Sequence, residues 1–314
     1  MMPMQLAQRE INFFNRIFSN HLELVPFIQT AIGYSLTGSV EEQCLFICYG
    51  QGQNGKSTFL NAVRSCLGDY AQQAQTSLLI SNNKVGNGED VASLFGSRFV
   101  ATIETKDGGS FDDAKVKMLT GGDRIRARNL YENSWEFSPT HKIWFATNHL
   151  PKINGADYAM ERRLRLLPFD AVISDNEKDL KLWEKLQSEQ DGIMAWAIDG
   201  LRAWRASGLP IPQIVKDKRK EYCASNDNFG QFINEVFVKD ENASIKSSQA
   251  FALYEQWMKD NGYEHNMSKQ SFAKKLKDRE YEQLKKSDGA YWRGLGLLEF
   301  TKDNSNLANE DKPF

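Results

Sequence analysis

The fold is decided by one stretch of the chain, Gly50-Gln51-Gly52-Gln53-Asn54-Gly55-Lys56-Ser57, which fits the phosphate-binding pattern G-x-x-x-x-G-K-[ST]. The glycines let successive backbone N–H groups turn toward a β-phosphate. The lysine reaches the β- and γ-phosphate oxygens, and the serine hydroxyl is a ligand for Mg²⁺. An apolar run at 44–49 precedes the stretch, and apolar residues at helical spacing follow it as far as Gly68. This order of strand, loop and helix predicts a nucleoside triphosphate site.

The predicted site takes ATP and Mg²⁺ as cofactors, and the dipole of the following helix adds positive potential where the phosphates would lie. The alternative interpretation, a glycine-rich surface turn, is disfavoured by the strand and helix on either side. Contacts with the nucleotide are expected from Gly50, Gln51, Gly52, Gln53, Asn54, Gly55, Lys56, Ser57 and Thr58.

Composition places the chain among ordinary globular proteins. Its 314 residues exceed one typical core, so two or three structural units are expected. No apolar run approaches the roughly 20 residues that span a bilayer, and the first residues do not form a signal peptide. These features predict a cytoplasmic protein with no membrane partner. The net charge of -2 leaves any nucleic-acid binding to local basic clusters.

Short apolar runs alternate with polar helical segments between residues 41 and 170, a rhythm typical of an α/β sheet with crossover helices. Near the C-terminus, helix starts at Ser247 and Ser268 precede two short strands around Asp288-Gly289. The predicted order is an N-terminal helical segment (1–40), an α/β ATPase core (41–170), a helical region (171–238), a winged-helix-like domain (239–301) and a disordered tail (302–314).

Hydrolysis of ATP also needs a carboxylate at the end of a neighbouring strand. The β-prone run 98–103 ends at Glu104, which is the predicted Walker B acid and, with Ser57, the predicted Mg²⁺ contact. Asp107, Asp112 and Asp113 are rivals, but none directly ends an apolar strand. The plainer reading of Glu104 is a surface glutamate at a strand end.

A third apolar run, 142–147, ends at Asn148, whose amide can position the attacking water or sense the γ-phosphate. Arg162 and Arg163 precede a fourth run. An arginine supplied by a neighbouring subunit suits the transition state of phosphoryl transfer and would couple hydrolysis to assembly. On the residues alone, an asparagine after a strand is usually a turn former, and the arginines are as well explained by a solvated basic turn.

These segments together resemble the helicase half of phage and plasmid primase-helicases, a branch of the superfamily 3 helicases with an AAA+ core. The resemblance runs from about Phe27 to Tyr222. The matching segments are Gly33-Tyr-Ser-Leu-Thr-Gly38, the loop 50–57, Glu104-Thr105, Lys117-Met-Leu-Thr-Gly-Gly-Asp123, Ala127-Arg-Asn-Leu-Tyr131, Ala146-Thr-Asn-His-Leu-Pro151 and Arg162-Arg163-Leu-Arg-Leu-Leu-Pro-Phe169.

The resemblance implies an ATP-driven DNA translocase that forms a homo-oligomeric ring, usually a hexamer, with ATP at the subunit interfaces. It assigns Lys56 and Ser57 to phosphate and Mg²⁺, Glu104 to water activation and Asn148 to sensing. Arg162 or Arg163 would reach the next subunit's site, with Arg163 preferred. It also implies single-stranded DNA and forked duplex as partners, a primase or polymerase module in cis or in trans, and a bacterial host cytoplasm.

The chain departs from the family pattern at two places. Thr105 follows Glu104 where the wider AAA+ pattern has a second acid, so the contact with Mg²⁺ is open to a bridging water. In the family, the stretch before the sensor strand forms a hairpin that projects into the ring channel. The expected tip of that hairpin, 131–134, has no lysine here, and which residue touches DNA is left open.

Basic residues in that stretch are the predicted DNA contacts: Lys117, Arg124, Arg126 and Arg128. The arginines alternate, so a strand would place them on one face, suited to gripping a single-stranded backbone without reading bases. The alternative is a solvated strand edge. In the winged-helix-like domain, Lys274 and Lys275 are predicted contacts for duplex or origin DNA, although such domains also dock proteins.

The favoured function is a replicative DNA helicase, and the first alternative is an origin-binding initiator that uses ATP as a switch to melt DNA without processive movement. Unwinding of a long forked duplex would separate the two. A small-molecule or polynucleotide kinase is a further alternative, because the phosphate loop alone does not exclude it. Stimulation of ATP hydrolysis by single-stranded DNA would exclude a kinase.

Overall fold

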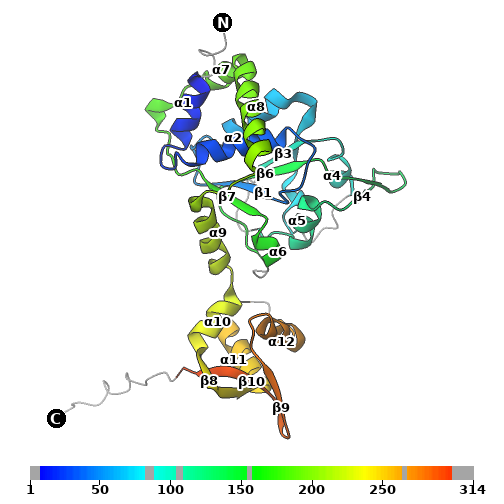
Figure 1. The fold of residues 1–314 in the computed structure, drawn as a ribbon, viewed down its shortest axis with the longest axis vertical. Coiled ribbons are helices and arrows are strands. Elements are labelled where there is room, and N and C mark those ends of the chain that lie inside the picture. The colour runs from blue at the N-terminus through cyan, green and yellow to red at the C-terminus, as the bar shows by residue number, and fades with distance from the viewer. Residues whose placement is uncertain (1–7, 82–87, 104–108, 154–157, 264–266, 299–314) are drawn as a thin grey trace, which may run out of the picture. The chain divides into compact units, whose positions relative to one another are not determined.

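A computed structural model describes residues 8–81, 88–103, 109–153, 158–263 and 267–298, with side chains from Phe13 onward. The chain divides into two compact units, residues 1–226 and 227–314, whose elements are labelled in Figure 1. This boundary falls inside the helical region expected at 171–238. In the described part of the chain, no helix combines the length and apolar character needed to cross a membrane.

The first unit is built on a five-stranded sheet of order β2-β3-β6-β1-β7, and every neighbouring pair is parallel. The apolar runs expected to be strands form four of these strands, and the α/β class is confirmed. The additional edge strand, β2, was not predicted because its sequence, Ala-Gln-Gln-Ala, carries no apolar pattern. The strands are β1 (Leu45–Tyr49), β2 (Ala71–Ala74), β3 (Phe99–Ile103), β6 (Lys142–Thr147) and β7 (Leu164–Pro168).

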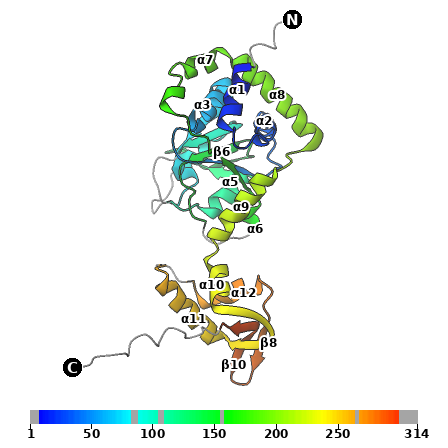
Figure 2. The same ribbon diagram turned by 90° about the vertical axis from the view of Figure 1, so that its left-hand side faces the viewer.

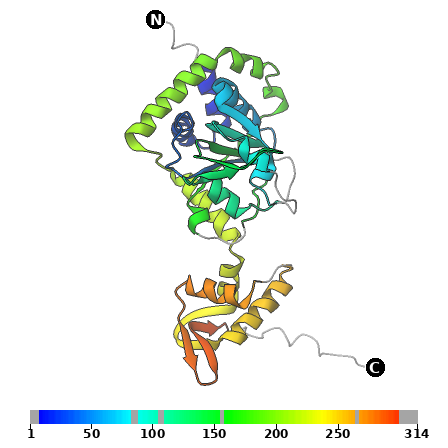
Figure 3. The ribbon, with the colours of Figure 1, turned by 90° about the vertical axis from the view of Figure 1, so that its right-hand side faces the viewer.

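Helices cover both faces of this sheet, which is why its central strands are almost wholly apolar (Figures 2 and 3). Alternate strand residues enter two cores. On one face, Phe46 and Phe99 stack on either side of Trp144, with ring centroids 4.2 and 5.7 Å from that of the tryptophan. The helices packed against this face are α1 (Gln8–Ile17), α2 (Leu24–Ser35), α3 (Lys56–Leu67) and α8 (Gln190–Ser207).

The opposite face carries the second core, in which Ile47, Phe145 and Leu166 are fully buried. It is covered by α5 (Asp113–Thr120), α6 (Tyr158–Glu161), α9 (Gln213–Ser225) and a two-stranded hairpin of β4 (Ile125–Ala127) and β5 (Trp135–Phe137). The shorter elements of the unit are α4 (Gly88–Ala92), α7 (Leu182–Ser188) and the 3-10 turns η1 (Gly68–Tyr70), η2 (Thr76–Leu78) and η3 (Asp175–Glu177).

The N-terminal helices α1 and α2 belong to the same compact unit as the sheet. Helix α2 is buried along most of its length and crosses α8 at two glycines. A Cβ at Gly33 would lie 2.0 Å from the backbone nitrogen of Leu201, and a Cβ at Gly200 would lie 1.9 Å from the carbonyl oxygen of Gln29. The two helices therefore approach backbone to backbone, which only glycine permits.

The C-terminal unit packs three helices on a three-stranded antiparallel sheet of order β8-β10-β9. Helix α11 begins at Ser247, and Ser268 caps α12 by accepting a 3.2 Å hydrogen bond from the backbone N–H of Ser271, as predicted. The core holds the buried aromatic residues Phe232, Phe272 and Trp292. The elements are α10 (Asn228–Val236), β8 (Phe237–Lys246), α11 (Ser247–Asp260), α12 (Lys269–Lys277), β9 (Gln283–Lys286) and β10 (Gly289–Leu297).

The close crossing of α2 and α8 predicts that Gly200→Ala destabilises the protein by about 1–3 kcal/mol. The added methyl group would overlap the backbone carbonyl oxygen of Gln29, which is fixed within α2. The loss should appear although alanine is the better helix former. Chemical or thermal unfolding monitored by circular dichroism measures it. Gly122→Ala is the matched control, since a Cβ there meets nothing within 4 Å. Equal stability of the two variants would contradict the close crossing.

Candidate functional site

The predicted phosphate loop lies between β1 and α3, at the carboxyl edge of the sheet. Gly50 and Gly55 have φ of +146° and +84°, a backbone region that favours glycine, and Gln53 has φ of +61°. A Cβ at Gly50 would lie 2.4 Å from the carbonyl oxygen of Phe169, and one at Gly55 would lie 2.7 Å from Ile17 of α1. The glycines of the motif are thus required by the turn and by close packing on both sides.

Lys56 is buried and points back onto its own loop. Its ammonium donates to Asn54 Oδ1 at 3.0 Å and to the carbonyl oxygens of Gly50 and Gln51. Burial lowers the pKa of Lys56 below its ordinary value, opposed by the Cys48 thiol. A triphosphate entering the loop would replace these acceptors with charged oxygens and would favour the protonated lysine. Ser57, next in the chain, is exposed at the start of α3.

Asn54 connects the loop to the end of β7. Its side-chain nitrogen donates to the carbonyl oxygen of Phe169 at 2.8 Å and to that of Gln51, while its oxygen accepts from Lys56. The backbone adds two links, from the N–H of Phe169 to the Tyr49 oxygen and from the N–H of Ile173 to the Gln53 oxygen. Sequence reasoning did not assign this role because the motif permits any residue at position 54.

Asn148 lies beside the loop at the same edge of the sheet. It follows Thr147, which pairs with Tyr49 of β1, and neighbouring parallel strands are about 4.8 Å apart. Strand β3 ends at Ile103, which pairs with Ala146. Glu104 and Asp107 lie outside the described residues. Of the rival acids, Asp112 accepts a 3.1 Å hydrogen bond from the backbone N–H of Lys115 and caps α5, which gives it a structural role.

A cavity of about 1040 Å³ adjoins the loop. Its wall combines Gly55 and Ser57 with Phe13 from α1 and with Trp183 and Leu186 from α7. The lining surface is mainly apolar, and charged side chains such as Glu177 and Lys185 also contribute to it. The cavity therefore borders the loop at the start of α3.

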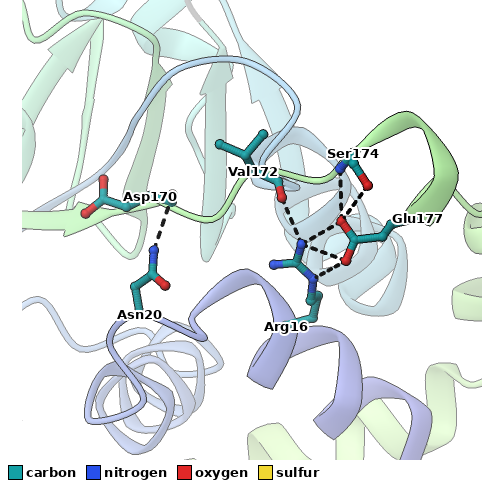
Figure 4. Close-up of polar contacts among 6 residues, drawn as sticks. All are labelled: Arg16, Asn20, Asp170, Val172, Ser174 and Glu177. Atoms are coloured by element: carbon teal, nitrogen blue, oxygen red, sulfur yellow. Dashed lines mark hydrogen bonds and ion pairs between the residues drawn. The ribbon is translucent and has the colours of Figure 1, made fainter.

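Arg16 lines this cavity, and its contacts are drawn in Figure 4. The guanidinium donates to the carbonyl oxygen of Val172 at 2.8 Å and to the two carboxylate oxygens of Glu177 at 2.9 Å each. Glu177 also accepts from the N–H and hydroxyl of Ser174, and the hydrogen bonds from Arg16 and Ser174 lower its pKa to about 2. No sequence pattern links Arg16 with Glu177, which lie far apart in the chain.

The two candidate arginines are in different environments. Arg163 is 8% exposed, and it donates to the Thr120 hydroxyl at 3.0 Å and to the Ala159 carbonyl oxygen. Arg162 is exposed, and its guanidinium donates to Gln43 Oε1 at 2.7 Å. Both precede β7 and therefore lie at the amino edge of the sheet, opposite the phosphate loop. Of the two, Arg162 is exposed, whereas Arg163, the expected residue, is buried.

The β4–β5 hairpin presents the predicted arginine row. Arg124, Arg126 and Arg128 are exposed, whereas Ile125 and Ala127 between them are buried, which is the alternation expected of a strand. The exposed face also carries acceptors. Arg124 lies 3.7 Å from a Glu136 carboxylate oxygen, and Arg126 donates to the Ser134 hydroxyl at 2.7 Å. At the tip, Tyr131 is 92% exposed with φ of +63°.

The other predicted basic contacts differ in accessibility. Lys117 is partly buried on α5. In the C-terminal unit Lys274 is exposed, but Lys275 is partly buried, with its nitrogen 5.7 Å from the centre of the Phe229 ring. Burial, together with the nearby Arg279, lowers the pKa of Lys275. Lys274 is therefore better placed than Lys275 to meet a nucleic acid.

Two family descriptions match the chain. Residues 48–163 match a family of unknown function, DUF5906, and residues 224–311 match the family described as poxvirus D5 protein-like. The chain also has the fold of the NrS-1 C terminal region in its apo structure, with a TM-score of 0.61 at 10% identity over 94% of this chain and 79% of that one.

Viral proteins named "Putative helicase" and "Putative primase" are similar in sequence. A helicase-named protein of Acanthamoeba polyphaga mimivirus is 28% identical over 275 residues, covering 81% of this chain and 28% of that protein. One of Sputnik virophage is 24% identical over 92% of this chain and 39% of its own length. A primase-named protein of African swine fever virus is 23% identical over 76% of this chain and 27% of its own. The chain thus spans less than half of the length of these relatives.

Proposed function

Because the chain belongs to the primase-helicase family, we propose that it is the ATP-driven helicase part of such a protein, moving along single-stranded DNA as a homo-oligomeric ring. In this proposal the first unit is an AAA+ type ATPase core, the C-terminal unit is a winged-helix-like domain, and the ring is a hexamer. The observation that carries the proposal is the placement of the phosphate loop and the exposed Arg162 at opposite edges of one parallel sheet.

The roles around the nucleotide follow from these positions. The loop N–H groups and Lys56 would bind the phosphates, and the adjoining cavity would take the base and ribose. Ser57 and Glu104 would hold Mg²⁺, which offsets the charge of the phosphates when bound. Glu104 would polarise the attacking water, and Asn148, at the neighbouring strand end, would orient it.

Arg162 would act on the nucleotide of the next subunit. The amino edge of the sheet, where Arg162 lies, is separated from the phosphate loop of the same copy by the five residues of β1, or about 16 Å. This distance is more than an arginine side chain spans. A head-to-tail ring brings the amino edge of one copy to the carboxyl edge of the next and leaves no site without an arginine. Hydrolysis would then depend on assembly.

The arginine face of the hairpin would grip the DNA backbone. Three like charges on one face of a short hairpin suit a run of phosphates, and their partners Glu136 and Ser134 are exposed and readily exchanged for phosphate oxygens. Lys274 of the C-terminal unit would add a contact with duplex DNA. A primase module, in cis or in trans, and a forked duplex complete the proposed partners. An ATP-switched initiator would share these contacts but would not unwind a long duplex.

We predict that Glu104→Gln binds ATP with near-normal affinity but slows hydrolysis by at least about 100-fold, because the amide cannot accept the proton of the attacking water. Nucleotide binding by fluorescence and single-turnover hydrolysis measure the two effects. Asp112→Asn is the matched control and should keep its turnover. Normal turnover by Glu104→Gln would assign the base to a different acid.

Mixing two inactive variants tests the shared site. Lys56→Ala should abolish hydrolysis because the phosphates lose their lysine, and Arg162→Ala should do so because the neighbour's site loses its arginine. In an equal mixture, about a quarter of the head-to-tail interfaces combine an intact loop with an intact arginine, so about a quarter of the wild-type rate should return. Activity no greater than that of the separate variants would contradict an arginine supplied in trans.

The hairpin is tested by salt-dependent DNA binding. Arg128→Ala should weaken binding of an oligothymidylate several-fold and reduce the slope of log affinity against log salt by about 0.7, the value for one phosphate contact on a single strand. Fluorescence anisotropy at several salt concentrations measures both quantities. Arg202→Ala, an exposed arginine on α8 paired with Asp199, is the control. Identical slopes for the two variants would contradict the proposed contact between the hairpin and DNA.

A further inference from the structure

The turn that leads into β1 holds a non-glycine residue in the left-handed region. Gln43 has φ of +43°, and its N–H closes the turn by donating to the Val40 carbonyl oxygen at 3.0 Å. An L-residue with a side chain adopts this conformation at a cost that glycine avoids. Residues held in sparsely populated backbone regions cluster at functional sites. The side chain of Gln43 therefore needs an explanation beyond the turn itself.

The amide oxygen of Gln43 accepts the 2.7 Å hydrogen bond from the Arg162 guanidinium. The two residues lie more than a hundred positions apart and meet because β1 and β7 are parallel neighbours, with Leu45 paired to Leu164. Residues that precede paired positions on parallel strands emerge at the same edge. The contact is thus built into the register of the sheet.

The backbone of Arg162 is held as well. Its N–H donates to the Tyr158 carbonyl oxygen at 3.0 Å, and its own carbonyl oxygen accepts a 2.7 Å hydrogen bond from Arg165. Arg165 is buried, with 5% of its surface exposed. Because hydrogen bonds hold both its main chain and its guanidinium, the exposed side chain of Arg162 has a defined direction.

We propose that Gln43 is a positioning residue for Arg162, aiming its guanidinium at the phosphates of the nucleotide bound by a second copy of this chain. The inference rests on the proposed function, in which Arg162 acts in trans. A neutral amide suits the role, because it orients the guanidinium without cancelling its charge and yields its hydrogen bond to a phosphate, which is the stronger acceptor. A carboxylate at position 43 would compete with the phosphate.

Two substitutions at position 43 separate this role from a structural one. Gln43→Gly removes the amide and relieves the backbone, so its melting temperature should be equal to or higher than that of the wild type. Its kcat for DNA-stimulated ATP hydrolysis should nonetheless fall about 3- to 10-fold, as expected for loss of one orienting hydrogen bond, with KM for ATP unchanged. Gln43→Met, which keeps the side-chain length but replaces the amide oxygen with a weakly accepting thioether, should lose kcat to a similar extent.

Subunit mixing identifies the copy in which Gln43 acts. In the mixture of the two variants, the Lys56→Ala subunit provides Arg162 and the Arg162→Ala subunit provides the intact loop. Adding Gln43→Gly to the Lys56→Ala subunit should reduce the recovered rate about 3- to 10-fold. Adding the same substitution to the Arg162→Ala subunit should leave the recovered rate unchanged, because no arginine remains there to be positioned. This second mixture is the matched control for any general effect on folding or assembly.

Each contrary result has a distinct meaning. Equal losses with the substitution in either subunit, or a wild-type kcat for Gln43→Gly, would overturn the positioning role while leaving the trans arginine intact. Full activity of Arg162→Ala by itself would overturn the proposed role of Arg162 and this inference with it. The expected pattern is a loss confined to the subunit that provides Arg162.

Discussion

Parallel pairing of β1 with β6 on one side and β7 on the other is the constraint on which the rest of the structure depends. It brings the carboxyl ends of these strands together, so that Gly50 lies next to Asn148 and close to Phe169. It equally brings their amino ends together, so that Gln43 meets Arg162. One sheet thus separates the edge that carries the phosphate-loop motif from the edge that carries Arg162. Under the proposed function, the two edges take part in one reaction only if copies of the chain associate.

The loop is held from two sides. Asn54 and backbone hydrogen bonds attach it to the segment that follows β7, and Ile17 of α1 packs against Gly55. Lys56 satisfies its buried ammonium with oxygens of the loop itself. Under the proposed function, a nucleotide would replace those hydrogen bonds. The segment from Phe169 to Ile173 contacts the loop directly. Arg16 of α1 donates to the Val172 carbonyl oxygen in the same segment and to Glu177 after it, so the cavity wall and the loop share one hydrogen-bonded frame.

Sequence patterns predicted the features that depend on interactions over a few residues. The buried strands 45–49, 99–103, 142–147 and 164–168 are apolar because both faces of the sheet are covered, and the hairpin arginines share a face because strand side chains alternate. Strand β2 escaped prediction because an edge strand with polar residues has no such pattern. The burial of Arg163 and the exposure of Arg162 could not be predicted, since adjacent residues before a strand point in different directions and only the contacts with Thr120 and Ala159 show which one is buried.

The amino-acid sequence by itself determined the phosphate loop, the order of strands and helices, and the capped helices of the C-terminal unit, because glycine conformations, apolar periodicity and capping side chains act over a few residues. Only the tertiary structure decided which distant residues meet. Arg16 with Glu177, Asn54 with Phe169 and Gln43 with Arg162 are brought together by strand register and helix packing. Such contacts depend on the position of the whole backbone, and neither partner carries a local signal of the other.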